Sequence, residues 1–96
     1  MLVFNVIFRC FPGKREEFLQ RIKAGGIDEA CRAEEGNLGY EYYLSADHPD
    51  DLLLVEKWRD MEAVRAHARQ PHMAGMDAFK PEYVADLILE AYGKDR

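Results

Sequence analysis

The sequence predicts an α+β domain with the ferredoxin-like order β-α-β-β-α-β, in which a four-stranded antiparallel sheet carries helices on one face. Three observations support this fold class. Apolar residues alternate along residues 2–11, and two further apolar runs at residues 37–44 and 52–58 flank a short polar loop. Helix-spaced apolar residues occupy the segments between strands, so each of the two crossovers consists of two short helices.

Residues 2–11 are the first predicted strand, and both of its faces are mostly apolar. Asn5 is the exception, because it places an amide in the middle of one face. An amide buried in a central strand needs hydrogen-bond partners, since leaving it unpaired costs about 1 to 3 kcal/mol. We therefore expect polar neighbours around Asn5.

The first crossover is predicted as helices over residues 14–23 and 27–35, separated by Gly25-Gly26. Apolar residues recur at core spacing in the first helix, and Gly36 is a suitable C-terminal stop for the second. Residues 37–44 then form the second strand, and residues 45–51 are a polar loop that joins it to the third strand as a hairpin.

The third strand begins with the continuous apolar run Leu52 to Val55, a pattern typical of a strand buried on both faces. Asp60 can cap a following helix that continues to Ala68, and Pro71 ends that helix or begins another. The last strand is predicted near residues 83–92. The first and third strands, which are the most apolar, are expected at the centre of the sheet.

Length and composition indicate a single domain over residues 1–96. The formal net charge of −5 argues against nucleic acid as a partner, because nucleic-acid binding requires a basic patch. No segment approaches the about 18 to 20 apolar residues of a membrane span. Cys10 and Cys31 have no CxxC spacing, so we interpret them as free thiols of a cytoplasmic protein.

Helices on one face leave the other face of the sheet uncovered. We expect this uncovered face to carry four large apolar residues of the first strand, and exposing them would forgo about 1.5 to 3 kcal/mol each. They are Leu2, Phe4, Val6 and Phe8. A patch of this size usually marks an interface, so the sequence predicts a homodimer in which two sheets pack face to face as a dimeric α+β barrel.

Two histidines of the second crossover are candidate functional residues. His67 shares a helical face with Ala63 and Val64, which points it toward the sheet. It is either a histidine bonded to a backbone carbonyl or a general base at a ligand pocket. His72 is either an ordinary helix-start residue or part of the same pocket. We predict no metal site, because the H-x4-H spacing is not a zinc pattern and no cysteine or carboxylate trio is expected nearby.

Three further residues can contribute to a small-molecule site. Trp58 and Glu56 lie on the same side of the third strand, two residues apart. Trp58 is either a core residue or the wall of a site for a flat aromatic ligand. Glu56 either pairs with a basic residue at the strand end or has a pKa raised by its apolar surroundings, so that it can accept a proton. The hydroxyl of Tyr42 can bind a substrate oxygen if it faces the pocket, although tyrosine is also common in strands for structural reasons.

Three short elements carry a resemblance to a known family. They are Glu35-Gly36-Asn37-Leu38-x-Tyr40, then Glu56-x-Trp58, then Glu62-Ala63 with His67 and Pro71-His72. In this order and spacing the chain resembles the antibiotic biosynthesis monooxygenase family, and is most similar to its small bacterial members described as quinol monooxygenases. The resemblance implies dimers of ferredoxin-like subunits, in agreement with the pattern above.

The resemblance also implies a monooxygenase that uses dioxygen and a small quinol or phenol without a cofactor, because a deprotonated phenol ring is itself electron-rich. On this basis Asn5 and Trp58 would position the oxygen and plane of the ring. His67 or His72 would take the proton, and Tyr42 or Glu56 would orient the acceptor. A haem-degrading branch of the family carries a tryptophan where this chain has His67, so haem degradation is not expected.

Two other function classes remain open from the sequence. One is a dimeric binding module without catalysis, since every candidate residue has a credible structural role. The other is a cofactor-free isomerase or lyase that uses His67 as a base on a small metabolite, because one fold supports many functions.

Overall fold

The computed structural model describes residues 1–94 and has the predicted β-α-β-β-α-β order, with both crossovers split into two helices. The elements are β1 (Leu2–Cys10), α1 (Arg15–Ala24), α2 (Ile27–Arg32), β2 (Asn37–Leu44), β3 (Asp51–Trp58), α3 (Met61–Ala68), α4 (Pro71–Phe79), the 3-10 turn η1 (Lys80–Glu82) and β4 (Val84–Gly93). The strands form one antiparallel sheet in the order β2-β3-β1-β4. This confirms the ferredoxin-like α+β fold with β1 and β3 at the centre.

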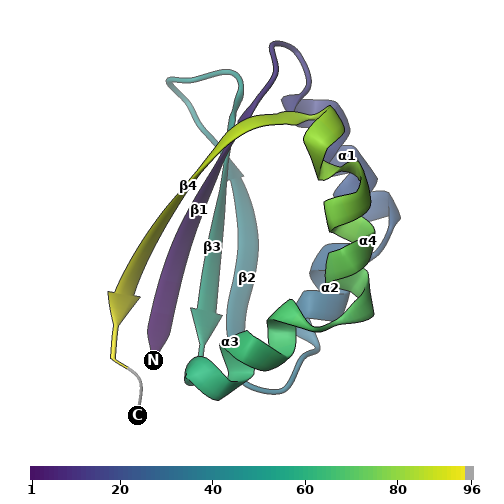
Figure 1. Ribbon diagram of the computed structural model, residues 1–96. Coiled ribbons are helices and arrows are strands. Elements are labelled where there is room, and N and C mark those ends of the chain that lie inside the picture. Colours follow the sequence, from purple (N-terminus) through teal and green to yellow (C-terminus); the bar gives the residue numbers. More distant parts are fainter. Residues whose placement is uncertain (95–96) are drawn as a thin grey trace.

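All four α-helices lie on one side of the sheet, and the other side is open (Figure 1). The core lies between the helices and the sheet, where aromatic rings from three segments meet. Phe18 of α1 packs edge-on against Phe8 of β1 and against Phe79 of α4, at centroid distances of 5.4 and 6.1 Å. Aromatic packing thus joins the helical layer to the sheet together with aliphatic residues such as Ile22 and Leu52.

The structure reverses the predicted orientation of β1. Val6 and Phe8 belong to the core beneath the helices, Phe4 packs against that core, and Leu2 is buried as well. The prediction that these four residues form the uncovered face is wrong. Alternation divides a strand into two sets of residues but does not say which set the helices cover, and in β1 both sets are largely apolar.

The open face is built from the alternate residues of the central strands. Cross-strand pairs on this face join Asn5 to Val55, Ile7 to Leu53 and Arg9 to Asp51. Its centre is aliphatic, and charged residues lie toward its ends, including the exposed Lys57 and the ion pair from Arg9 Nε to Asp51 Oδ2 at 3.6 Å.

The turn between α2 and β2 differs from the sequence prediction. The helix ends at Arg32, three residues before the predicted end. Gly36 has φ +83°, and a Cβ at this position would lie 2.6 Å from Ala63 Cβ of α3. Only glycine fits both the backbone conformation and the close approach. Residues 33–36 therefore turn tightly beneath α3, which brings Glu34 to the second crossover.

Local sequence signals set the two helices of the second crossover. Asp60 caps α3, with its Oδ1 accepting a hydrogen bond from the Ala63 N–H at 2.9 Å. Pro71 is the first residue of α4, where its missing N–H costs no helical hydrogen bond. The junction turns the chain so that His67, near the end of α3, and His72, at the start of α4, both approach Glu34.

Across residues 1–94, each helix is too short or too polar to span a bilayer. Pro81 lies in η1, and the last strand begins three residues later, at Val84.

Candidate functional site

A cluster of polar and aromatic side chains lies between the sheet and the helices. Glu56 and Trp58 project from the helix-facing side of β3, and His67 of α3 lies above them. The rings of Trp58 and His67 are 4.6 Å apart between centroids, and Trp58 is fully buried. The structure thus brings together three of the sequence-predicted site residues.

The indole of Trp58 fixes the carboxylate of Glu56. Trp58 Nε1–H donates a hydrogen bond to Glu56 Oε1 at 3.0 Å. Burial raises the pKa of Glu56, while the hydrogen bond from Trp58 and the charge of His67 oppose that shift only in part. His67 Nε2 lies 3.8 Å from Glu56 Oε1, an ion-pair distance that is too long for a hydrogen bond.

A second carboxylate, which the sequence analysis missed, connects both histidines. Glu34 Oε2 lies 2.9 Å from His67 Nδ1 and 2.7 Å from His72 Nε2. The Glu34 side chain is 8% exposed, whereas the neighbouring Glu35 is 90% exposed and pairs with Arg59 at 3.7 Å. We assign the proton of the His67–Glu34 bond to Nδ1, which leaves Nε2 as the basic nitrogen.

No feature of the local sequence singles out Glu34 over Glu35, because the two acids are adjacent in the same turn. The available signal was Gly36: a left-handed glycine ends a helical turn and fixes the direction of the residues before it. Choosing between the two acids requires the position of α3, which is a tertiary fact.

Tyr40 and Tyr42 of β2 complete the cluster. Their hydroxyl oxygens are buried, and among the residues that the structure describes neither makes a hydrogen bond of good geometry, although the Tyr40 hydroxyl lies near the Cys31 thiol and near the Tyr42 hydroxyl. The Tyr40 ring lies 5.9 Å from both the His67 ring and the Tyr42 ring. Burial raises the pKa of each phenol, so both remain protonated donors. Two buried donors without acceptors are unusual and suit a bound oxygen atom.

Two hollows border the cluster. The first, of about 400 Å³, is lined by Tyr40 and Tyr42 together with Leu19, Lys23, Arg32, Gly39 and Glu41. The second, of about 280 Å³, is lined by Glu34 and His72 together with Ala30, Ala33, Glu35, Ala66 and Gln70. Both volumes exceed the roughly 150 Å³ of a cavity that accepts benzene.

Asn5 does not join this cluster. It pairs with Val55 across β1 and β3, on the open face, whereas Glu56 and Trp58 face the helices. The expectation that Asn5 lines the same cavity as Trp58 and His67 is therefore wrong within one subunit. The error follows from the reversed orientation of β1. Exchanging the two faces of a strand moves every one of its side chains to the opposite side of the sheet.

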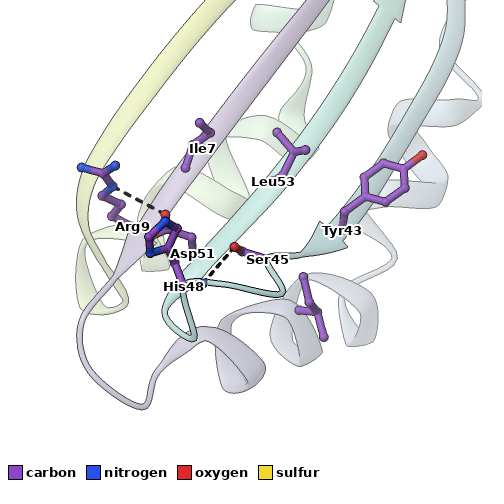
Figure 2. Close-up of a pocket in the computed structure, with 8 residues that line it drawn as sticks. Ile7, Arg9, Tyr43, Ser45, His48, Asp51 and Leu53 are labelled. Carbon is purple, nitrogen blue, oxygen red and sulfur yellow. Dashed lines mark hydrogen bonds and ion pairs between the residues drawn. The ribbon is translucent and has the colours of Figure 1, made fainter.

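A third hollow, of about 350 Å³, opens on the uncovered face near the β2–β3 loop. Figure 2 shows Ile7 and Leu53 on its floor, with Arg9 directed toward Asp51 and Tyr43 at its edge. It contains none of the predicted site residues. Its charged groups pair with each other, so they do not converge on an open centre as the groups of the buried cluster do.

Cys31 of α2 also reaches the cluster, contrary to the expectation that no cysteine lies near the histidines. Its sulfur and one ligand atom each of Glu34, His67 and His72 all lie within 4.8 Å of one another. Burial raises the pKa of the Cys31 thiol to about 12. The sequence did not predict this proximity because Cys31 and His72 are far apart in the chain.

The arrangement can move a proton. A histidine held at Nδ1 by a buried carboxylate presents Nε2 as a base, with the tilted Trp58 ring packed beside it and phenol donors on a strand of the same sheet. The aromatic side chains of the cluster give the ring of a bound ligand flat surfaces to pack against. The hydroxyls of Tyr40 and Tyr42 are two donors for an oxyanion.

Comparisons with known proteins agree with this architecture. The family model described as "Antibiotic biosynthesis monooxygenase" matches residues 1–78. The Bacillus subtilis (strain 168) protein described as "Putative monooxygenase YcnE" is 33% identical over 78 residues, which cover 81% of this chain and 80% of that protein.

Solved structures of the same shape include protein SO0527 from Shewanella oneidensis, with a TM-score of 0.87 and 26% identity, covering 97% of this chain and 89% of that one. A protein from Nitrosomonas europaea described as a "putative antibiotic biosynthesis monooxygenase" also has a TM-score of 0.87, at 23% identity and 98% coverage of both chains. At 23% identity the latter shows the fold alone. The match of the family model over most of the chain, joined to the YcnE similarity, establishes that this chain belongs to the antibiotic biosynthesis monooxygenase family.

Proposed function

We propose that this chain is a cofactor-independent monooxygenase that oxidises a small quinol or phenol with dioxygen. Family membership and the similarity to YcnE support a monooxygenase-type function. The observation that carries the finer proposal is the buried His67–Glu34 hydrogen bond at 2.9 Å, next to two phenol hydroxyls without acceptors. This combination supplies a base and oxyanion donors, which is what a self-activating aromatic substrate requires.

The substrate ring is proposed to enter the hollow of about 400 Å³ that Tyr40 and Tyr42 line. A pocket of this size falls at the lower end of the range typical for small ligands. The ring oxygen would accept hydrogen bonds from the two tyrosine hydroxyls. His67 lies behind Tyr40, with 5.9 Å between the two ring centroids, and Trp58 lies beside His67.

His67 is proposed as the base, and Glu34 as its positioning residue. Glu34 accepts from Nδ1–H and stabilises the imidazolium that forms when Nε2 takes the phenol proton. Glu56, fixed by its hydrogen bond from Trp58, lies on the Nε2 side of the ring at 3.8 Å from that nitrogen. His72 shares Glu34 from the other side and so helps fix the carboxylate.

The proposed reaction balances with dioxygen as the oxidant and the quinol as the only source of electrons. The phenolate transfers electrons to dioxygen, and a bond forms between a ring carbon and one oxygen atom. The O–O bond then breaks, that atom stays on the ring, and the other leaves as water with two hydrogens from the quinol. A quinol and O₂ thus give a hydroxyquinone and H₂O, so the substrate is oxidised by four electrons and dioxygen is fully reduced.

The active form is proposed to be a homodimer joined through the open face of the sheet. The central residues of that face include Val3, Ile7, Leu53 and Val55, which are only half-buried in a single subunit. Covering them removes apolar area at about 25 cal/mol per Å². Asn5 would then lie within the interface, which gives it a role in assembly. The unpaired buried thiols of Cys10 and Cys31 suit the cytoplasm.

Oxygen uptake with a panel of hydroquinones, measured in the presence of a chelator, tests this function. We expect wild-type protein to consume oxygen and to place one atom of ¹⁸O₂ in the product. His67→Ala should lower kcat by about 10² to 10⁴ because the base is lost. His48→Ala, in the exposed β2–β3 loop, is the matched control and should keep the wild-type rate.

Wild-type uptake at the buffer rate across the panel would contradict the oxygenase proposal. Ligand-dependent thermal stabilisation without turnover would then favour a binding module. Turnover without oxygen consumption would favour an isomerase or lyase.

A further inference from the structure

The second hollow leads to a set of side chains that the proposed reaction uses only in part. Cys31 and Glu34 come from the end of α2 and the turn after it, and His67 and His72 come from the junction of α3 and α4. One thiol sulfur, one carboxylate oxygen and two imidazole nitrogens lie mutually within 4.8 Å. These four groups converge from segments that are more than thirty residues apart in the chain.

The donor types are those that zinc prefers. Zinc in proteins takes four ligands in a tetrahedron from cysteine sulfur, histidine nitrogen and carboxylate oxygen. A mixed sulfur and nitrogen set favours zinc and related late transition metals over magnesium or calcium, which bind oxygen. The nitrogens that would bind the ion, His67 Nδ1 and His72 Nε2, are the ones that now face Glu34. Metal binding therefore replaces their hydrogen bonds to this carboxylate and displaces the proton of His67 Nδ1.

The surroundings suit a bound cation as well. Cys31 is fully buried, and Met73 Sδ lies 3.8 Å from its sulfur, which holds the sulfur in place. On the far side of His67, Glu56 Oε1 lies 3.8 Å from Nε2. When the ion displaces the proton of Nδ1, the ring carries its proton on Nε2, and a carboxylate on that side favours this tautomer. The hollow of about 280 Å³ beside Glu34 and His72 gives an ion access from the surface.

We propose that Cys31, Glu34, His67 and His72 form a binding site for one divalent cation of the zinc class. In a tetrahedral site with bonds of about 2.0 to 2.3 Å, ligand atoms lie roughly 3.3 to 3.8 Å apart. Glu34 Oε2, now at 2.9 and 2.7 Å from the two nitrogens, therefore moves outward by about half an ångström or more when the ion binds. Rotation of the Glu34 side chain toward the adjoining hollow of about 280 Å³ accommodates that shift.

This site does not rest on the proposed oxygenase activity. The two proposals share His67 and Glu34, so an ion in the site takes both away from proton transfer. If both proposals hold, zinc inhibits oxygen uptake and a chelator restores it. If the oxygenase proposal fails, metal binding is still measured directly.

Cobalt(II) titration of the chelator-stripped full chain tests the site. We expect one equivalent to bind, with the intense visible bands of tetrahedral cobalt and a near-ultraviolet thiolate-to-cobalt charge-transfer band. Zinc should displace the cobalt and abolish both. Cys31→Ser should remove the charge-transfer band, whereas Cys10→Ser, at the buried thiol of β1, should keep it.

His72→Ala provides a second variant at a less buried position, with a side chain 20% exposed, and should weaken cobalt binding at least tenfold. Two results would overturn the proposal. One is a wild-type titration that shows only the weak bands of octahedral cobalt, which would mean that the four groups form a hydrogen-bonded network only. The other is a charge-transfer band that survives Cys31→Ser.

Discussion

The two faces of the sheet are made by alternate residues of the same strands, yet they differ in kind. The helix-covered face combines an aromatic core with buried acids, histidines and phenols, and most of these polar groups contact one another. The open face is aliphatic at its centre and carries its charges near its ends.

This difference separates two tasks. Buried charges with shifted pKa values and convergent donors are typical of reactive sites, whereas a half-exposed aliphatic surface with peripheral charges is typical of subunit contact. One four-stranded sheet can thus present chemistry on one side and assembly on the other. The following experiments change one face and leave the other intact.

Neighbouring leucines on β3 give the largest expected contrast in folding stability. Leu54 is 1% exposed beneath the helices, and Leu53 is half-buried on the open face. Leu54→Ala should reduce the free energy of unfolding by about 2 to 5 kcal/mol, because it leaves a cavity in the core. Leu53→Ala should cost clearly less in the dissociated subunit, where its side chain is half-buried, so both variants are compared at a protein concentration below the dissociation constant of the proposed dimer. Urea unfolding of both variants at one protein concentration measures the difference, and equal costs would mean that the two faces are equally buried.

Placing a charge at the centre of the open face should dissociate the dimer. Val55→Lys buries an unpaired ammonium in the proposed interface, and we expect the dimer to weaken by about 100-fold or more. Sedimentation should then report a monomer of 11.1 kDa where the wild type has twice that mass. Gln20→Lys, on the exposed side of α1, adds the same charge elsewhere and should leave the dimer intact. A wild-type monomer at micromolar concentration would contradict this use of the open face.

Removing a paired carboxylate should also lower the free energy of unfolding more on the helix-covered side than on the open face. These effects should be smaller than those of the leucine variants. Asp28 of α2 is 1% exposed and pairs with Lys23 and with Arg32, the latter at 2.8 Å. Burial acts to raise the pKa of Asp28, but the hydrogen bond and charge of Lys23 and the charge of Arg32 outweigh it, so the pKa is lowered. Asp28→Asn should cost about 1 to 3 kcal/mol, and Asp51→Asn at the open face about 0 to 1 kcal/mol.

The sign of the pH dependence follows from the lowered pKa. The contribution of Asp28 is fully present above its ordinary pKa of 3.8 and is lost as the pH falls through the lower folded-state value. The stability difference between wild type and Asp28→Asn should therefore be constant at neutral pH and shrink in acid. Unfolding curves between neutral pH and strong acid check this, and a difference that grows on acidification would contradict the assignment.

The sequence was sufficient for the order of elements, because periodicity, the Asp60 cap and Pro71 are local signals. It was not sufficient for the orientation of β1, since both sets of alternate residues are apolar there and only packing against α1 and α4 chooses between them. The misplacement of Asn5 follows from that one ambiguity.

The candidate site shows the same limit. Glu56 and Trp58 are two residues apart, so strand alternation alone places them together. Glu34 and His67 are 33 residues apart, and Cys31 contacts Met73 at a separation of 42. These contacts depend on how the two crossovers pack over the sheet, which no local pattern determines. The half of the site that lies on one strand was predictable, and the half that joins two crossovers was not.

The central claim is that the buried Glu34–His67 pair on the helix-covered face performs the proton transfer. Matched carboxylate-to-amide variants on the two faces test it most directly: Glu34→Gln beneath the helices and Glu90→Gln on β4, opposite Asn5 on the open face. With a hydroquinone that the wild type oxidises, in chelator and with thermal melting as the check on folding, we predict that Glu34→Gln lowers kcat by about 100-fold or more and that Glu90→Gln leaves it unchanged. Equal rates for wild type and a folded Glu34→Gln, or a loss of rate in Glu90→Gln instead, would contradict the account.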